Sequence, residues 1–143
     1  AYEKHGKCAV GIKEVTPERI VKYSSMKVEN IESNVYAIDD MIEKPSFDKV
    51  FSMYSILGRC VLTPDIFDVL ESIPYGAGGE LQLTDAMGEI ARRDGMVGVD
   101  FDGIRYDMGN KFGIIKANIE VGLNHPEVKD ELREFIKKIA SEI

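Results

Sequence analysis

Three short polar segments stand out in this sequence because a hydrophobic core has no need of their residues. The first is Glu43-Lys44-Pro45, which directly follows an apolar run typical of a strand. Pro45 restricts the residue before it, so we expect Lys44 to be extended and the Glu43 and Lys44 side chains to point to opposite sides. A carboxylate held there could accept hydrogen bonds from sugar hydroxyls, and an ammonium could neutralise a phosphate. By spacing alone, a charged strand end at the surface explains these residues better.

The second segment is a glycine-rich loop that leads into a predicted helix. Residues 76–79 read Gly-Ala-Gly-Gly, and the polar residues Glu80, Gln82, Thr84 and Asp85 follow. Backbone N–H groups at such a junction can bind an anion, although the Gly-Lys-Ser/Thr of a P-loop is missing. Thr84 and Asp85 are more typical of helix caps than of ligands. Glu80 is the better functional candidate because it lies at the hinge between loop and helix.

The third segment, residues 105–111, reads Arg-Tyr-Asp-Met-Gly-Asn-Lys. Asp107 precedes a glycine that permits a sharp turn, and a helix is predicted to follow. A carboxylate placed there could bind Mg²⁺ as a hard oxygen ligand, or it could cap the helix. Both interpretations stay open on spacing alone. We expect Lys111 to face solvent.

The remaining polar residues form no recognisable catalytic set. His5 and His125 have no Cys or His at metal-ligand spacing, so we expect neither to be catalytic. Ser24 and Ser25 have no nearby histidine, so a Ser-His nucleophile pair is not supported. The sequence therefore offers phosphate-binding and metal-binding candidates but no nucleophile.

Strand and helix patterns alternate along the chain, which is typical of the α/β class. No repeat or linker divides the sequence, so we expect a single unit over residues 1–143. The apolar patterns predict strands over residues 8–15, 35–42, 52–62 (buried on both faces) and 96–101, and a strand end followed by a loop over 22–33. They predict helices after Thr16, after Thr63, over 80–93, over 112–123 as a buried helix, and from His125-Pro126-Glu127 to the C-terminal end.

Composition limits the classes of function. The 143 residues include 25 Asp plus Glu and 18 Lys plus Arg, which gives a formal net charge of −7 and a pI of about 4.9. This balance argues against a nucleic-acid partner or an anionic membrane, because both require a basic face. No apolar run approaches the roughly 20 residues of a membrane span. Cys8 and Cys60 lie in apolar, strand-like contexts, so we expect buried free thiols and a reducing, cytoplasmic compartment.

Five segments, in this order, resemble bacterial and archaeal UTP–glucose-1-phosphate uridylyltransferases, also called UDP-glucose pyrophosphorylases. They read KYSSMK, IEKP, ILGRCVLTPDIF, GAGGELQLTDA and RYDMGNKFGIIKANIEVGLNHPE. The last two are specific to this enzyme within the wider sugar-nucleotidyltransferase family. The resemblance implies the C-terminal part of a Rossmann-like nucleotide-diphospho-sugar transferase fold, a mixed sheet with flanking helices. The family's N-terminal half, with the nucleotide-binding loop and uracil pocket, has no counterpart in these residues.

The resemblance also implies roles for individual residues. Glu43 corresponds to the acid that binds the glucose hydroxyls, and Lys44 to the catalytic lysine that contacts the sugar-side phosphate. Asp107 corresponds to an acid near the catalytic Mg²⁺, and Glu80 to a sugar-contacting acid. Ser24 stands where the family has a glycine whose backbone contacts the sugar. Either that contact is altered here or the local alignment is shifted.

The reaction implied by the resemblance is attack by an oxygen of glucose 1-phosphate on the α-phosphorus of UTP, which yields UDP-glucose and pyrophosphate. Catalysis would come from positioning and charge neutralisation, without a covalent enzyme intermediate. We expect glucose 1-phosphate or UDP-glucose as ligands, UTP only in an intact enzyme, and no activity from this chain alone.

Two alternatives remain at this point. One is a non-catalytic module whose C-terminal helices assemble into a homo-oligomer, because the missing half would leave surface uncovered. The other is a thymidylyl- or another sugar-nucleotide transferase, because the base pocket is not in this sequence.

Overall fold

The computed structural model describes residues 1–106 and 108–143, without the side chain of Ala77. The chain divides into two compact units, Ala1–Asp102 and Gly103–Ile143, and each unit is described by itself. The expectation that residues 1–143 act as a single unit stays a prediction.

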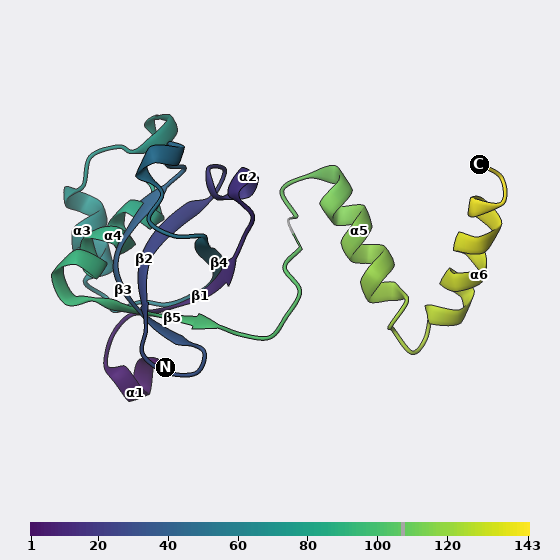
Figure 1. Cartoon of the computed structure of the whole chain (residues 1–143), viewed down its shortest axis with the longest axis horizontal. Helices are drawn as coiled ribbons and strands as arrows, with labels where there is room; N and C mark the ends of the chain where they lie inside the picture. The colour runs from purple at the N-terminus through teal and green to yellow at the C-terminus, as the bar shows by residue number, and fades with distance from the viewer. Residues whose placement is uncertain (107) are drawn as a thin grey trace. The chain divides into compact units, whose positions relative to one another are not determined.

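The first unit is built on a mixed sheet of five strands (Figure 1). β1 and β5 run parallel, whereas the pairs β1–β4, β2–β3 and β3–β5 are antiparallel. The predicted α/β class with a mixed sheet and flanking helices is confirmed. The strand order is β2-β3-β5-β1-β4, formed by β1 (Ala9–Glu14), β2 (Ser24–Asn30), β3 (Val35–Glu43), β4 (Tyr54–Val61) and β5 (Met96–Asp100).

Two helices cover one side of this sheet, α3 (Ile66–Ser72) and α4 (Leu83–Asp94) (Figure 1). α4 packs closely on β3 at Gly88, where an added Cβ would lie 2.9 Å from the carbonyl oxygen of Met41. The short elements are α1 (Tyr2–His5), α2 (Pro17–Ile20) and the 3₁₀ turns η1 (Phe47–Lys49) and η2 (Ala77–Gly79). The core between sheet and helices includes Ile12, Met26, Ile38, Ile90 and Met96, all at most 2% exposed.

Two predictions about strands need correction. Residues 24–30, expected as a strand end and loop, form the full strand β2 because they pair with β3 from Ser24–Glu43 to Asn30–Tyr36. The strand expected to be buried on both faces is β4, which pairs with β1 at the edge of the sheet. Its second half is exposed, with Cys60 among the exposed residues, so only Cys8 is a buried free thiol.

The second unit contains helices α5 (Lys111–Gly122) and α6 (Lys129–Ala140). The Asn110 side chain caps α5 by accepting a 2.6 Å hydrogen bond from the Gly113 amide. α5 confirms a predicted helix, but it is not buried: Ala117 is the one buried residue along it. Within the described residues, no helix is both long and apolar enough to span a bilayer.

Candidate functional site

The predicted Glu43-Lys44 pair lies at the end of β3, where β2 begins beside it. Glu43 is the last residue of β3 and pairs with Ser24, the first residue of β2. The Lys44 amide then donates a 2.7 Å hydrogen bond to the carbonyl oxygen of Tyr23. The backbone of Glu43 is therefore held by its pairing with Ser24 in the sheet, and the backbone of Lys44 is held by its hydrogen bond to Tyr23.

Lys44 does not adopt the extended conformation that Pro45 led us to predict. Its φ is +45°, and Arg59 is the only other non-glycine residue with positive φ in the described chain. A side chain in this left-handed region costs about 1–2 kcal/mol, so the surrounding structure must hold it. Here the bond to Tyr23 and the buried ring of Pro45 do so, which overrides the local preference of a residue before proline.

The charged groups of this pair are free to meet a ligand. Glu43 is half-buried and Lys44 is exposed. Neither side chain has a hydrogen-bond or ion-pair partner among the residues that the structure describes. A carboxylate and an ammonium on a constrained backbone, without internal partners, can accept a hydroxyl hydrogen bond and contact a phosphate.

The Ser24 side chain is buried and forms hydrogen bonds within the first unit. It is 3% exposed, and its Oγ accepts a 3.1 Å hydrogen bond from the Ile56 amide and lies 3.4 Å from the Ser55 hydroxyl. The Ser24 side chain thus ties the start of β2 to β4. Any contact of this residue with a ligand would have to come from its backbone, as the resemblance implied for the residue at this position.

Ser25 plays a similar structural part that the sequence analysis missed. Its Oγ accepts hydrogen bonds from the amides of Phe51 (3.0 Å) and Ser52 (3.2 Å) and donates to the Ser52 carbonyl oxygen (2.9 Å). The sequence could not predict these partners, because residues 51 and 52 lie in a loop far from Ser25 along the chain.

The glycine-rich loop turns sharply before α4 begins. Gly78 and Gly79 have φ of +75° and +73°, and the Gly76 amide donates a 2.9 Å hydrogen bond to the Glu80 carbonyl oxygen. Glu80 itself is extended and exposed, and its carboxylate accepts a 3.2 Å hydrogen bond from Gln82. The structure therefore leaves Glu80 at the hinge, but the helix starts three residues later than predicted, at Leu83.

The expected capping role of Thr84 and Asp85 is wrong. Gln82 occupies the N-cap position, without a side-chain capping bond. Asp85 lies against Gly76 instead: a Cβ added to Gly76 would lie 1.9 Å from Asp85 Oδ2. A side chain at position 76 would therefore require the Asp85 carboxylate or the loop to shift.

A cavity of 320 Å³ lies between β3, the loop after α3 and α4. Its lining includes Asp40, Asp85 and Arg92, but not Glu43, Lys44 or Glu80. Arg92 donates hydrogen bonds to Asp40 (2.6 Å) and Glu89 (2.9 Å), and these two carboxylates, Glu89 first, raise the pKa of Arg92. Because Arg92 is already satisfied, this cavity is less suited to an anion than the Glu43–Lys44 end of β3.

The predicted Mg²⁺ ligand, Asp107, lies outside the described residues. Among those that are described, no group of three or more His, Cys, Asp and Glu side chains could hold a metal ion. Lys111, at the first position of α5, is exposed, as expected. His5 lies 3.3 Å from Glu32 and His125 accepts a 3.3 Å hydrogen bond from the Glu127 amide, so both have local structural contacts.

Comparison with known proteins confirms the resemblance drawn from the five segments. The chain is 42% identical over 139 residues to UTP–glucose-1-phosphate uridylyltransferase 2 of Staphylococcus saprophyticus. The aligned residues make up 97% of this chain and 48% of that relative. A UTP–glucose-1-phosphate uridylyltransferase of Bacillus subtilis is 38% identical over 138 residues, 96% of this chain and 46% of the relative.

A solved UDP-glucose pyrophosphorylase complexed with UDP-glucose matches with a TM-score of 0.82 and 37% identity, over 87% of this chain and 47% of the other. No protein-family model matches the chain. The chain thus spans about half the length of the curated relatives it matches.

Proposed function

The chain is homologous to UTP–glucose-1-phosphate uridylyltransferases over about half of their length, and we propose that it forms the sugar-binding part of such a nucleotidyltransferase. The complete reaction would join glucose 1-phosphate and UTP into UDP-glucose and release pyrophosphate. The proposal that this is the C-terminal half rests on the resemblance, in which the family's N-terminal nucleotide-binding half has no counterpart in these residues. UTP would be bound only by the intact enzyme.

The observation that carries the proposal is the free, backbone-constrained pair at the end of β3. Glu43 would accept hydrogen bonds from glucose hydroxyls, while Lys44 would neutralise charge on the sugar-side phosphate. An oxygen of that phosphate attacks the α-phosphorus of UTP, one P–O bond forms, and the bond to pyrophosphate breaks. Lys44 would act as the catalytic residue by stabilising this charge, which requires positioning rather than a nucleophile.

Two further residues complete the proposed sugar site. Glu80 is exposed at the hinge before α4 and would supply a second acceptor for sugar hydroxyls. Ser24 pairs with Glu43 across β2 and β3, so its backbone would approach the same sugar, while its hydroxyl stays bonded to β4.

Mg²⁺ is part of this proposal through a single residue. The ion commonly takes one or two protein carboxylates and fills its shell with water and substrate phosphates. Asp107 would be the carboxylate that this chain contributes. When bound, the ion would supply charge neutralisation at the phosphates.

We also propose that the isolated chain is inactive, that it self-associates and that it works in the cytoplasm. Self-association is favoured by the apolar residues that the second unit exposes, among them Phe112 at 75% and Phe135 at 57%. Assembly would accompany the enzymatic role rather than replace it.

A titration of the isotope-labelled chain with UDP-glucose and Mg²⁺, followed by NMR, tests the proposed site. We expect shifts at Glu43, Lys44 and Glu80 that disappear in Lys44→Ala and persist in Lys49→Ala, which removes a nearby exposed lysine. A well-folded chain that shows no shifts at these residues would contradict the proposal. Formation of UDP-glucose from UTP and glucose 1-phosphate by the chain alone would contradict the proposed inactivity.

A further inference from the structure

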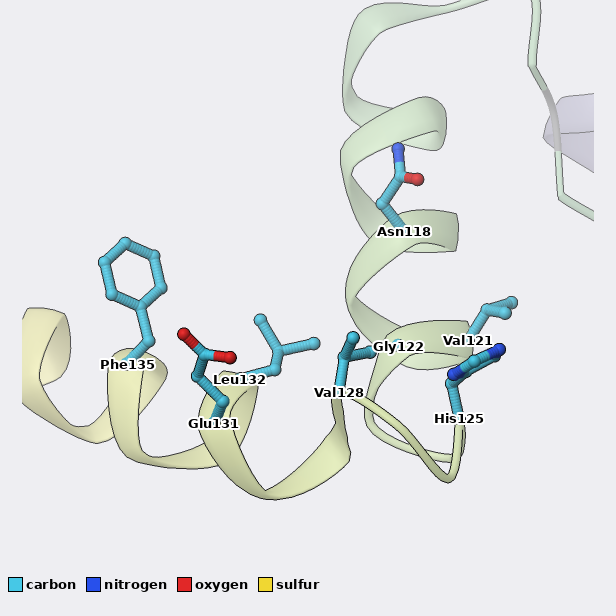
Figure 2. Close-up of a pocket in the computed structure, with 8 residues that line it drawn as sticks. All are labelled: Asn118, Val121, Gly122, His125, Val128, Glu131, Leu132 and Phe135. Atoms are coloured by element: carbon cyan, nitrogen blue, oxygen red, sulfur yellow. The ribbon is translucent and has the colours of Figure 1, made fainter.

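Two further features of the molecule stand out from its contacts. One is a groove of 590 Å³ between α5 and α6, whose lining is mainly apolar (Figure 2). Nothing in the structure shows what covers this groove, and it carries no inference. The other feature is the loop from Lys44 to Met53, which joins β3 to β4 and is bound near both ends by residues 23 and 25, where β2 begins.

One short segment of chain holds both ends of this loop. At the start of the loop, the Lys44 amide donates a 2.7 Å hydrogen bond to the carbonyl oxygen of Tyr23. Near its end, the amides of Phe51 and Ser52 donate to the Oγ of Ser25, at 3.0 and 3.2 Å. Tyr23 and Ser25 are two residues apart, so the loop is closed against the first turn of chain in β2.

The hydrogen bonds at the returning end are reciprocal. Ser25 is completely buried, and its hydroxyl donates to the Ser52 carbonyl oxygen at 2.9 Å. The Ser52 hydroxyl in turn donates to the Met26 carbonyl oxygen at 2.6 Å. β2 and β4 are the edge strands of the sheet, so side-chain hydroxyls join this end of the loop to β2. Loss of the Ser25 acceptor would leave two amides unpaired at a cost in free energy, which keeps residues 51 and 52 in place.

This closure bears on the conformation of Lys44. A residue before proline prefers an extended backbone, and an extended Lys44 would continue the direction of β3 and lead the loop away from β2. Because residues 51 and 52 are bound to Ser25, the chain must instead turn where it leaves β3. Lys44 lies at this turn, and its φ is +45°.

We propose that Ser25 is a positioning residue for Lys44. Ser25 holds the returning end of the loop, and the closed loop keeps Lys44 in its left-handed conformation, which sets the place of the ammonium group. The inference deepens the proposed function and rests on it for its effect on a ligand, since that effect requires Glu43 and Lys44 to form the sugar site. The conformational link between Ser25 and Lys44 can be tested without a ligand.

NMR of the whole 143-residue chain compares Ser25→Ala with Ser55→Ala. Ser55 is as deeply buried as Ser25, but its hydroxyl lies 3.4 Å from Ser24 Oγ, away from the amides of the loop. In the left-handed region the amide proton and the Hα of one residue lie close together, so Lys44 should give a strong intraresidue NOE in wild type. We expect Ser25→Ala to weaken this NOE and Ser55→Ala to keep it. A Lys44 NOE that is equally strong, or equally weakened, in both variants would overturn the proposal.

Native-state hydrogen exchange of the wild-type chain tests the same link, and it needs no variant that could fail to fold. The amides of Lys44, Phe51 and Ser52 should exchange with the same opening free energy, because release of one end opens the loop as a unit. A Lys44 amide that stays protected while the amides of Phe51 and Ser52 exchange freely would overturn the proposal.

Titration with UDP-glucose and Mg²⁺ measures the effect on the site. If the loop releases Lys44, only a fraction of Ser25→Ala molecules holds the binding conformation, so we expect the dissociation constant to rise about fivefold or more. Ser55→Ala should keep the wild-type value. Unchanged affinity in Ser25→Ala with a weakened Lys44 NOE would overturn the positioning role. A wild-type chain that binds no UDP-glucose would contradict the proposed sugar site instead, while the NOE and exchange results would decide the conformational link.

Discussion

The Lys44 amide donates a 2.7 Å hydrogen bond to the Tyr23 carbonyl oxygen, one residue beyond the last β2–β3 pair, Ser24 with Glu43. This bond continues the strand pairing past the point where Lys44 leaves the sheet with a φ of +45°. The strained residue and the proposed sugar acceptor are therefore positioned by one hydrogen-bonded ladder. Such strain at a non-glycine residue persists where the surrounding structure determines it, often at sites that bind ligands.

Replacing Lys44 separates its backbone strain from its charge. Lys44→Gly and Lys44→Ala both remove the ammonium, so both should lose UDP-glucose binding. Glycine tolerates positive φ, so Lys44→Gly should be more stable than Lys44→Ala by about 1 kcal/mol. Urea unfolding of both variants measures this difference. Equal stabilities, or a glycine variant less stable than the alanine variant, would show that the left-handed conformation is not strained.

Adding a methyl group at Gly76 should disturb the loop before α4. An alanine Cβ there would lie 1.9 Å from Asp85 Oδ2, so the carboxylate or the loop must move. We expect Gly76→Ala to lower the free energy of unfolding by about 1–3 kcal/mol.

The Gly76→Ala/Asp85→Ala double variant removes the atom that clashes. A double-mutant cycle on the two variants should therefore be strongly non-additive, with the double variant recovering part of the loss. If the two substitutions change the free energy of unfolding additively, the destabilisation by Gly76→Ala does not come from a clash with Asp85.

Sequence reasoning located the candidate site by chemistry and missed its conformation. Residue types after an apolar run single out Glu43 and Lys44, and the resemblance assigns them their roles. β3 ends at Glu43, one residue later than the apolar run predicts. The left-handed Lys44 was not predictable, because the rule for a residue before proline is local and the bond to Tyr23 is not. Whether a charged side chain is free or paired also depends on tertiary contacts, and the spacing of apolar residues in the sequence does not predict these contacts.

The strand that was missed, β2, shows the same limit. Its sequence, SSMKVEN, begins with buried serines and ends with exposed polar residues, so it lacks a clear apolar alternation. It becomes a strand because β3 pairs with it over its whole length and because Ser24 and Ser25 bind amides of residues 51–56. Strands with their own apolar pattern, such as β1 and β5, were predicted within two residues.

Removing the Ser25 hydroxyl should destabilise the first unit. Ser25 is fully buried, and its Oγ accepts from the amides of Phe51 and Ser52. Ser25→Ala would leave two N–H groups without this acceptor, so we expect a loss of about 1–3 kcal/mol in the free energy of unfolding. Ser33→Ala, at an exposed serine, is the control and should stay within about 0.5 kcal/mol of wild type. If the two variants have the same free energy of unfolding, the Ser25 hydrogen bonds do not stabilise the contact between β2 and residues 51–56.

The link between Asp65 and Arg93 should make stability depend on acid pH. Asp65 accepts hydrogen bonds from the Thr63 hydroxyl and from Arg93, and these contacts, Thr63 first, lower the pKa of the Asp65 carboxyl. A lowered folded-state pKa stabilises the fold above the ordinary aspartate pKa of about 4, and this contribution is lost as pH falls through the folded value. Asp65→Asn should therefore lower the urea midpoint at pH 7 and flatten its fall between pH 5 and pH 2. The exposed Asp68→Asn is the control variant, since it removes one carboxylate charge from α3 and leaves the Thr63–Asp65–Arg93 contacts in place. Parallel profiles for wild type and Asp65→Asn would mean that the Asp65 contacts do not contribute to the acid dependence of folding.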